Sequence, residues 1–269
     1  MLSGVAAPAS EIVTFPSGSL MLHGVLFKPQ GTGPFPAVVY NHGSAAGMLS
    51  QEAFDALGPV FVRQHWILFG PYRRGQGLSA EAGGYIGDEI DAAKKQGGAA
   101  AGAAKMVQLL ETDHLDDQLA ALEWLRKQPF VDQRRIAVAG NSFGGIETIL
   151  GAEREGYCAA IDSAGGAESW ALAPALQDRM KRAVQHAKAP IFFFQAENDW
   201  NLSPSQVLSA VMKAAGKPFE VKNLPAVSPL AARRSLVRLL RIGGMGGRRL
   251  SVSEPPLRRT VNSPDNEGS

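Results

Sequence analysis

The sequence predicts an α/β protein with a doubly wound, mostly parallel sheet that is opened by an antiparallel hairpin. Short apolar runs of strand length alternate with stretches of helix length as far as residue 224. This alternation is typical of βαβ units with right-handed crossovers. The 269 residues, 45% hydrophobic and 19% charged, have the composition of an ordinary globular protein. We expect one domain over residues 1–226, with residues 227–269 as a separate tail.

The first half of the chain supplies the hairpin and the first parallel strands. Two strand patterns, residues 12–15 and 20–27, flank a Pro-Ser-Gly-Ser turn. Residues 37–40 are a continuous apolar run, as in strands buried inside a parallel sheet. A helix pattern over residues 52–64 and a strand over 66–70 follow. Residues 80–111 are rich in Ala and Gly and poorly patterned, which predicts loosely packed helix and loop, with a lid as one interpretation.

The second half continues the alternation. Thr112 or Asp113 can cap a helix that ends before Pro129. Further expected elements are a strand over residues 135–139, a helix over 144–153, strands over 159–163 and 190–195, a helix over 203–215 and a strand over 219–224. Because the carboxyl ends of parallel strands meet at one edge of the sheet, we expect the functional site there.

Ser142 stands at the junction of the expected strand and helix, in the pentapeptide Gly-Asn-Ser-Phe-Gly of residues 140–144. Glycines two positions before and after the serine let strand and helix approach closely, as a nucleophile elbow requires. The spacing alone is a weak signal, and an ordinary glycine-rich turn with a solvated serine is the alternative. The strand-turn-helix context favours Ser142 as a nucleophile.

A nucleophilic serine needs a base, a carboxylate that orients the base, and donors for the oxyanion. The expected donors are the backbone N–H groups of Phe143 and of Ser44, at neighbouring strand ends. For the carboxylate we expect Asp199, on the turn after a later strand, with Glu197 in reserve. Capping of the next helix is the alternative role for Asp199.

From about Glu11 to Leu224 the chain resembles the α/β-hydrolase fold superfamily, closest to its dienelactone hydrolase and prolyl oligopeptidase-like branch. The matching segments are Asn41-His42-Gly43, Tyr72-Arg73-Arg74-Gly75-Gln76-Gly77, the pentapeptide around Ser142, and Ala196-Glu197-Asn198-Asp199. The resemblance implies a serine hydrolase of small carboxylic esters or lactones. A catalytically inactive binding protein and an aminopeptidase-like hydrolase are the alternatives.

The resemblance also assigns roles to two of these segments. It implies that His42 and Gly43 support the oxyanion loop and that His42 is not the base. The Arg73-Arg74 turn could contact an anionic substrate, but we expect it to be a solvated surface turn.

The base is missing from the expected position. The resemblance implies a histidine after the acid, yet no histidine follows His186, which precedes Asp199. We expect His186 to be a surface residue at a helix end. His65 and His114, also at helix ends, are weaker candidates, and His23 is expected to be a packed or surface residue of the hairpin.

The composition changes abruptly near Leu224. No aromatic residue follows Phe219 and no lysine follows Lys222, whereas eight arginines lie in residues 227–269 among Pro, Ser and Gly. A change of reading frame near Leu224 is one hypothesis, and a divergent tail is the other. The tail could form a basic amphipathic helix, for which a solvated face is the expected interpretation. We expect residues from Val227 onward to be irregular and poorly packed.

The remaining features concern location and partners. No uninterrupted apolar run is long enough to span a membrane, and the first ten residues lack the pattern of a signal peptide. Cys158 is the single cysteine, which fits a reducing compartment, so we expect a cytoplasmic protein. Without a nucleic-acid, metal or phosphate motif, we expect a small-molecule substrate, no nucleic-acid partner, no metal and no cofactor. Substrate identity and oligomeric state stay open.

Overall fold

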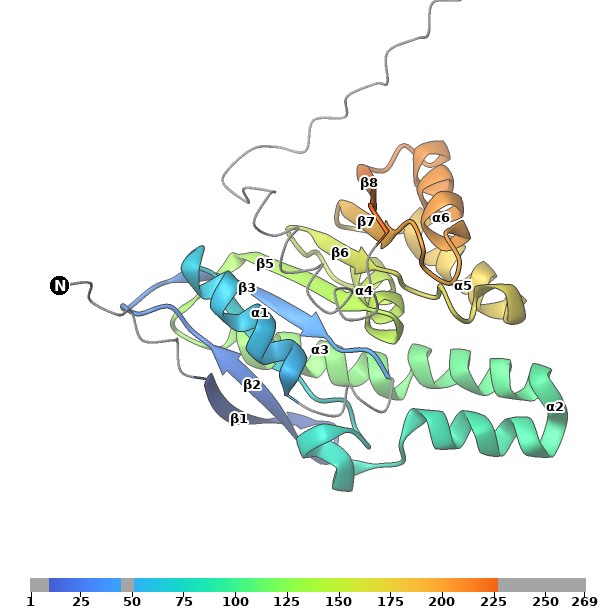
Figure 1. The fold of residues 1–269 in the computed structure, drawn as a ribbon. Helices are drawn as coiled ribbons and strands as arrows, with labels where there is room; N and C mark the ends of the chain where they lie inside the picture. Colours follow the sequence, from blue (N-terminus) through green and yellow to red (C-terminus); the bar gives the residue numbers. More distant parts are fainter. Residues whose placement is uncertain (1–9, 45–50, 227–269) are drawn as a thin grey trace, which may run out of the picture.

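A computed structural model describes residues 10–44 and 51–226. Within them, eight strands form one sheet in the order β1-β2-β4-β3-β5-β6-β7-β8 (Figure 1). The strands β1 and β2 form an antiparallel hairpin, and β2 is antiparallel to β4. All other neighbours are parallel. The predicted fold class, a mostly parallel sheet opened by an antiparallel hairpin, is confirmed.

The elements follow the expected alternation. The strands are β1 (Ser10–Ser17), β2 (Leu20–Phe27), β3 (Phe35–Asn41), β4 (Ile67–Pro71), β5 (Val131–Asn141), β6 (Ala160–Ser163), β7 (Ile191–Ala196) and β8 (Phe219–Leu224). The helices are α1 (Glu52–Arg63), α2 (Ile86–Glu111), α3 (Asp113–Arg126), α4 (Phe143–Arg154), α5 (Pro174–Gln185) and α6 (Ser203–Ala214), with short 3-10 helices η2 (Gly77–Ala82) and η3 (Trp170–Leu172).

The sheet has an apolar core on each face. Because side chains alternate along a strand, Val38 and Tyr40 of β3 pack on the α1 side, whereas Ala37 and Val39 pack on the other. Helices α3, α4 and α5 lie on that second face (Figure 1). The central strands β3 and β4 are therefore buried on both faces, as their continuous apolar runs require, whereas the edge strands β1 and β8 are largely exposed.

Residues 86–111 form a helical hairpin, which Figure 1 shows extending beyond α3. Gly98, with φ of 76°, breaks α2 into two arms, a backbone conformation that glycine adopts without strain. Lys105 and Glu89 form an ion pair between the arms. Arg179 of α5 pairs with Glu111 at the end of α2. The expected helix is present, and residues 91–101 near the tip are mostly exposed.

The start of α3 differs from the sequence-based expectation. Thr112 occupies the N-cap position of α3, but its hydroxyl donates to the Gln108 carbonyl 2.8 Å away, so the predicted side-chain cap is wrong. The predicted tail, with its possible basic helix, lies outside the described residues, and the domain boundary at residue 226 stays a prediction. Across residues 10–44 and 51–226, none of the helices combines the length and apolarity that crossing a membrane requires.

Candidate active site

Ser142 links the end of β5 to the start of α4. Its backbone has φ of 57° and ψ of −119°, in a region that non-glycine residues rarely occupy and that is costly to hold. Its N–H donates to the Ser163 carbonyl at the end of β6, 3.0 Å away. A Cβ on Gly140 would overlap the Gly144 carbonyl, so the glycine spacing has a steric cause. The expected strand-turn-helix geometry is present.

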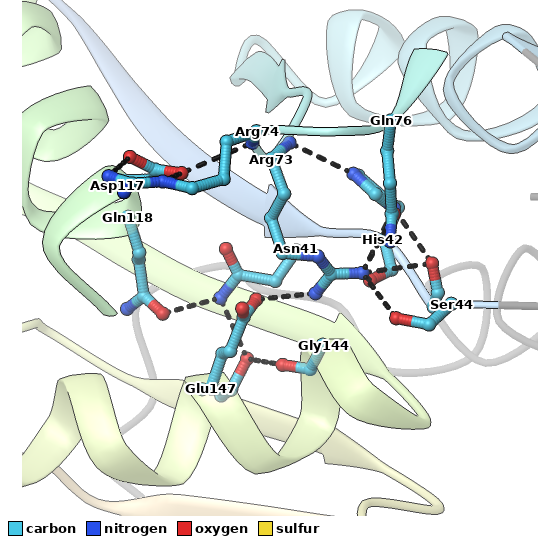
Figure 2. Close-up of polar contacts among 12 residues, drawn as sticks. Asn41, His42, Ser44, Arg73, Arg74, Gln76, Asp117, Gln118, Gly144 and Glu147 are labelled. Atoms are coloured by element: carbon cyan, nitrogen blue, oxygen red, sulfur yellow. Dashed lines mark hydrogen bonds and ion pairs between the residues drawn. The ribbon is translucent and has the colours of Figure 1, made fainter. Parts of the chain in front are cut away.

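Residues 41–44 continue β3 and lie against the Ser142 turn. A Cβ placed on Gly43 would lie 3.5 Å from the Ser142 Cβ. The Asn41 amide donates to the Gln118 side chain at 3.0 Å and to the Thr148 hydroxyl at 3.3 Å, which ties this loop to α3 and α4 (Figure 2). The structure therefore brings the Gly43-Ser44 segment and the serine turn together. Phe143 is the first residue of α4, so its N–H has no acceptor within the helix.

His42 is buried, and both of its ring nitrogens have protein neighbours. The backbone N–H of Arg73 donates to Nε2 at 3.2 Å, so we assign the ring proton to Nδ1, which lies 2.7 Å from the Gly43 carbonyl oxygen. Burial, together with the charge of Arg73, holds the pKa of His42 well below its usual value. Both nitrogens of this neutral imidazole are therefore engaged by backbone groups, and the role of His42 in supporting an oxyanion loop stays a prediction.

The expectation of a solvated Arg73-Arg74 turn is wrong. Only 4% of Arg73 is exposed, and its guanidinium forms a 2.7 Å ion pair with Glu147 of α4 (Figure 2). Arg74 forms a bidentate pair with Asp117 of α3, at 2.9 and 2.7 Å. The turn pattern gave no sign of these carboxylates because they come from helices far along the chain.

Asp199 lies on the loop after β7, at the same edge of the sheet as Ser142, because β5, β6 and β7 are parallel neighbours. Its carboxylate accepts bonds from the Trp200 N–H at 2.8 Å and from the Gln195 amide at 3.2 Å. The N-cap residue of α6 is Leu202, without a side-chain cap, so the alternative capping role is wrong. Glu197, the reserve acid, is exposed.

Asp162, at the end of β6, was not among the predicted site residues. Only 1% of it is exposed, and Oδ1 accepts the Gly165 N–H at 2.9 Å, while Oδ2 has no partner among the described residues. Burial raises the pKa of Asp162 to about 7, and the charge of Asp199 acts in the same direction. The sequence signal is an aspartate directly after the apolar run of residues 159–161.

Asp162→Asn is expected to change how stability depends on pH. The folded-state pKa is raised to about 7 from 3.8, so the wild type loses stability as pH rises through about 7. Asparagine keeps the acceptor for Gly165 but carries no charge. The melting temperature of the variant relative to wild type should therefore increase by several degrees between pH 5 and 8. Asp178→Asn, at an exposed position on α5, is the control, and a constant difference for Asp162→Asn across this range would contradict the expectation.

The other histidines lie away from Asp199. His65 precedes β4 and His186 precedes β7, so both lie at the amino ends of strands, opposite to Ser142. His114 is the second residue of α3 and lines a small cavity together with His42, Arg73 and Glu147. Burial lowers the pKa of His114 to about 2. His23 is in β2, on the hairpin side of the sheet.

A model of the dienelactone hydrolase family matches residues 22–228. Among solved structures, an acylaminoacyl peptidase of Pyrococcus horikoshii is 16% identical with a TM-score of 0.66, over 95% of this chain and 44% of the peptidase. A putative dienelactone hydrolase from Klebsiella pneumoniae subsp. pneumoniae is 17% identical with a TM-score of 0.63, over 87% of this chain and 98% of the other.

A third solved structure, the dienelactone hydrolase from Anabaena variabilis, is 17% identical with a TM-score of 0.62, over 90% of this chain and 100% of that chain. At these identities the structures establish the α/β-hydrolase fold. The present chain spans less than half of the peptidase. Because the family match covers most of its length, the chain belongs to the dienelactone hydrolase family.

Proposed function

We propose that the chain is a serine hydrolase in which Ser142 attacks the carbonyl carbon of a small carboxylic ester or lactone. The observation that carries the proposal is the strained backbone of Ser142 at the start of α4, in contact with the Gly43 loop. Such a turn exposes a nucleophile at the edge of a sheet. In the proposed roles, Asp199 is the acid of the triad, and Phe143 and Ser44 donate to the oxyanion.

The chemistry follows from the position of these groups. Attack by the Ser142 hydroxyl oxygen turns the substrate carbonyl oxygen into an oxyanion, and the proton of the hydroxyl must pass to a base. Backbone N–H groups that already point at the oxyanion stabilise it without reorganisation. In this proposal the donors are the Phe143 N–H, which has no acceptor within α4, and the Ser44 N–H after Gly43. Collapse of the intermediate breaks the bond to the alcohol oxygen, which takes the proton from the base, and leaves an acyl group on Ser142. Water then hydrolyses this acyl-serine and releases the acid.

A small acyl substrate fits the family match better than a polypeptide. The names of two similar structures refer to dienelactone hydrolases, which are of about the length of this chain. An aminopeptidase-like activity is the second candidate, because an acylaminoacyl peptidase has a similar fold. It ranks second because the peptidase is more than twice as long as the part that matches this chain. A panel of acyl esters, lactones and acylaminoacyl anilides separates the two candidates.

The expected result with a fluorophosphonate probe is covalent labelling of the wild type that disappears in Ser142→Ala. The oxyanion donors stabilise the charge that develops when the hydroxyl attacks the probe, and a base accelerates this attack. Without a base we expect slow labelling, which a long incubation detects. Ser169→Ala, on the loop after β6, is the control and should label like the wild type. If the folded wild type is not labelled between pH 5 and 9, the chain is instead a hydrolase-fold binding protein.

A further inference from the structure

A buried arginine, Arg73, connects the loop after β3 with helix α4, which begins directly after Ser142. Arg73 Nη2 lies 2.6 Å from the His42 carbonyl oxygen, 2.9 Å from that of Gly43 and 3.0 Å from the Ser44 hydroxyl (Figure 2). Two hydrogens on Nη2 serve the two carbonyls at the shortest distances. Nη1 of the same guanidinium pairs with Glu147 at 2.7 Å. One side chain therefore contacts both the loop after β3 and the helix that begins at Phe143.

The bond to the Gly43 carbonyl also fixes the direction of the next N–H. The Gly43 carbonyl and the Ser44 N–H belong to one planar peptide unit, so in the trans form they point in opposite directions. Two donors hold this carbonyl, Arg73 Nη2 at 2.9 Å and His42 Nδ1 at 2.7 Å. The Ser44 N–H must therefore point away from the guanidinium.

Glu147 supplies the second half of the connection. It lies four residues after Phe143 on α4, and residues at this spacing share one helix face. Only 1% of Glu147 is exposed, so its carboxylate has little water to compete with Arg73. The ion pair thus sets the position of the first turn of α4 relative to the Gly43 loop.

We propose that Arg73 is a positioning residue that fixes the two oxyanion donors, the N–H groups of Ser44 and Phe143, relative to each other. This inference rests on the proposed function, because only an oxyanion at Ser142 gives the alignment a catalytic consequence. The arginine does not touch the reacting atoms. It acts through the Gly43 carbonyl on one side and through Glu147 on the other.

The choice of residue supports the assignment. A guanidinium presents several donors in a rigid fork, whereas a lysine ammonium is a point charge on a flexible stem. Lysine at position 73 can keep the charge opposite Glu147 but cannot hold that carboxylate and two carbonyls in fixed geometry. Arg73→Lys therefore separates the positioning role from the charge.

The test measures saturation kinetics of fluorophosphonate labelling of Ser142, per folded molecule. For Arg73→Lys we expect the limiting labelling rate to fall at least about tenfold with probe affinity nearly unchanged, since losing one oxyanion donor costs about 10²–10³ and misalignment costs part of this. Arg179→Lys is the matched control, because Arg179 is also buried and pairs with two glutamates. Labelling of folded Arg73→Lys within about twofold of wild type would overturn the proposal.

Two further measurements cover the other outcomes. Amide hydrogen exchange of a peptide that covers residues 41–44 should accelerate in Arg73→Lys and not in Arg179→Lys, a readout that needs no chemistry at Ser142. If hydrogen exchange of this peptide is unchanged in Arg73→Lys, the positioning role of Arg73 is overturned, whether or not the wild type is labelled. Failure of the wild type to label refutes only the proposed function. If Arg73→Lys does not fold, Glu147→Gln replaces it. The glutamine amide oxygen of this variant can still accept a hydrogen bond from Arg73 Nη1, but the ion pair is lost, so we expect labelling to be a few-fold slower. An unchanged labelling rate overturns the connection between Arg73 and α4.

Discussion

Gly144→Ala is expected to lose more than about 4 kcal/mol of folding free energy, a large part of the roughly 5–15 kcal/mol that stabilises a typical domain. The added Cβ would overlap the Asn41 carbonyl and lie 2.8 Å from the His42 carbonyl oxygen. These are backbone atoms, so no rotamer change can relieve the overlap. Either α4 separates from the loop after β3, or the loop moves away from Ser142.

The measurement is chemical denaturation, with Gly156→Ala as the matched control. Gly156 lies in a loop where an added Cβ meets nothing within 4 Å, so this substitution should change stability by less than about 0.5 kcal/mol. A folded Gly144→Ala protein should at least lose fluorophosphonate labelling, because the loop that carries Ser44 would be displaced. A stable variant that labels at the wild-type rate would contradict the packing described here.

The sheet and the serine turn were predictable because their signals are local. Buried parallel strands are continuous apolar runs, and the run before Ser142 ends in the glycine spacing that a tight turn to a helix requires. The position of Asp199 followed from the strand pattern of residues 190–195 and from the rule that parallel strands share a carboxyl edge.

The two ion pairs of the Arg73-Arg74 turn were not predictable, because the partners of each pair lie far apart in the sequence. Arg73 and Glu147 are 74 residues apart, and Arg74 and Asp117 are 43 apart. A pair of arginines in a glycine-containing turn is usually solvated, and only the packing of α3 and α4 supplies the buried carboxylates. Glu147 alone is a weak hint, since it is the one charged residue among residues 143–150.

Turnover is expected to be at least about 10³-fold lower than that of a family member with a complete triad, because general-base assistance is worth roughly 10²–10⁴. No histidine follows His186 in the sequence. Both ring nitrogens of His42 have protein neighbours, and His186 lies at the opposite edge of the sheet. What remains is substrate binding and the oxyanion donors, which do not remove the proton from the Ser142 hydroxyl.

Added imidazole tests this interpretation directly. An imidazole molecule that enters the space between Ser142 and Asp199 can accept the hydroxyl proton, so ester hydrolysis should rise with imidazole concentration beyond the rate of imidazole alone. The increase should vanish in Ser142→Ala and shrink in Asp199→Asn, because the carboxylate orients and stabilises the imidazolium. Glu197→Gln, an exposed neighbour on the same loop, is the control for Asp199→Asn.

Resequencing the gene around codon 224 distinguishes the two hypotheses for the tail. A one-base correction that restores an in-frame histidine would supply the base, and the corrected protein should then turn over without imidazole. If the frame is correct and the unaided chain hydrolyses esters at rates typical of serine hydrolases, with loss in Ser142→Ala, the expectation of an idle site is wrong. Another histidine would then be the base, with His42→Gln and His186→Gln the first variants to measure. His186 could reach Ser142 only if α5 and β7 rearranged, so activity lost in His186→Gln would also contradict the described sheet.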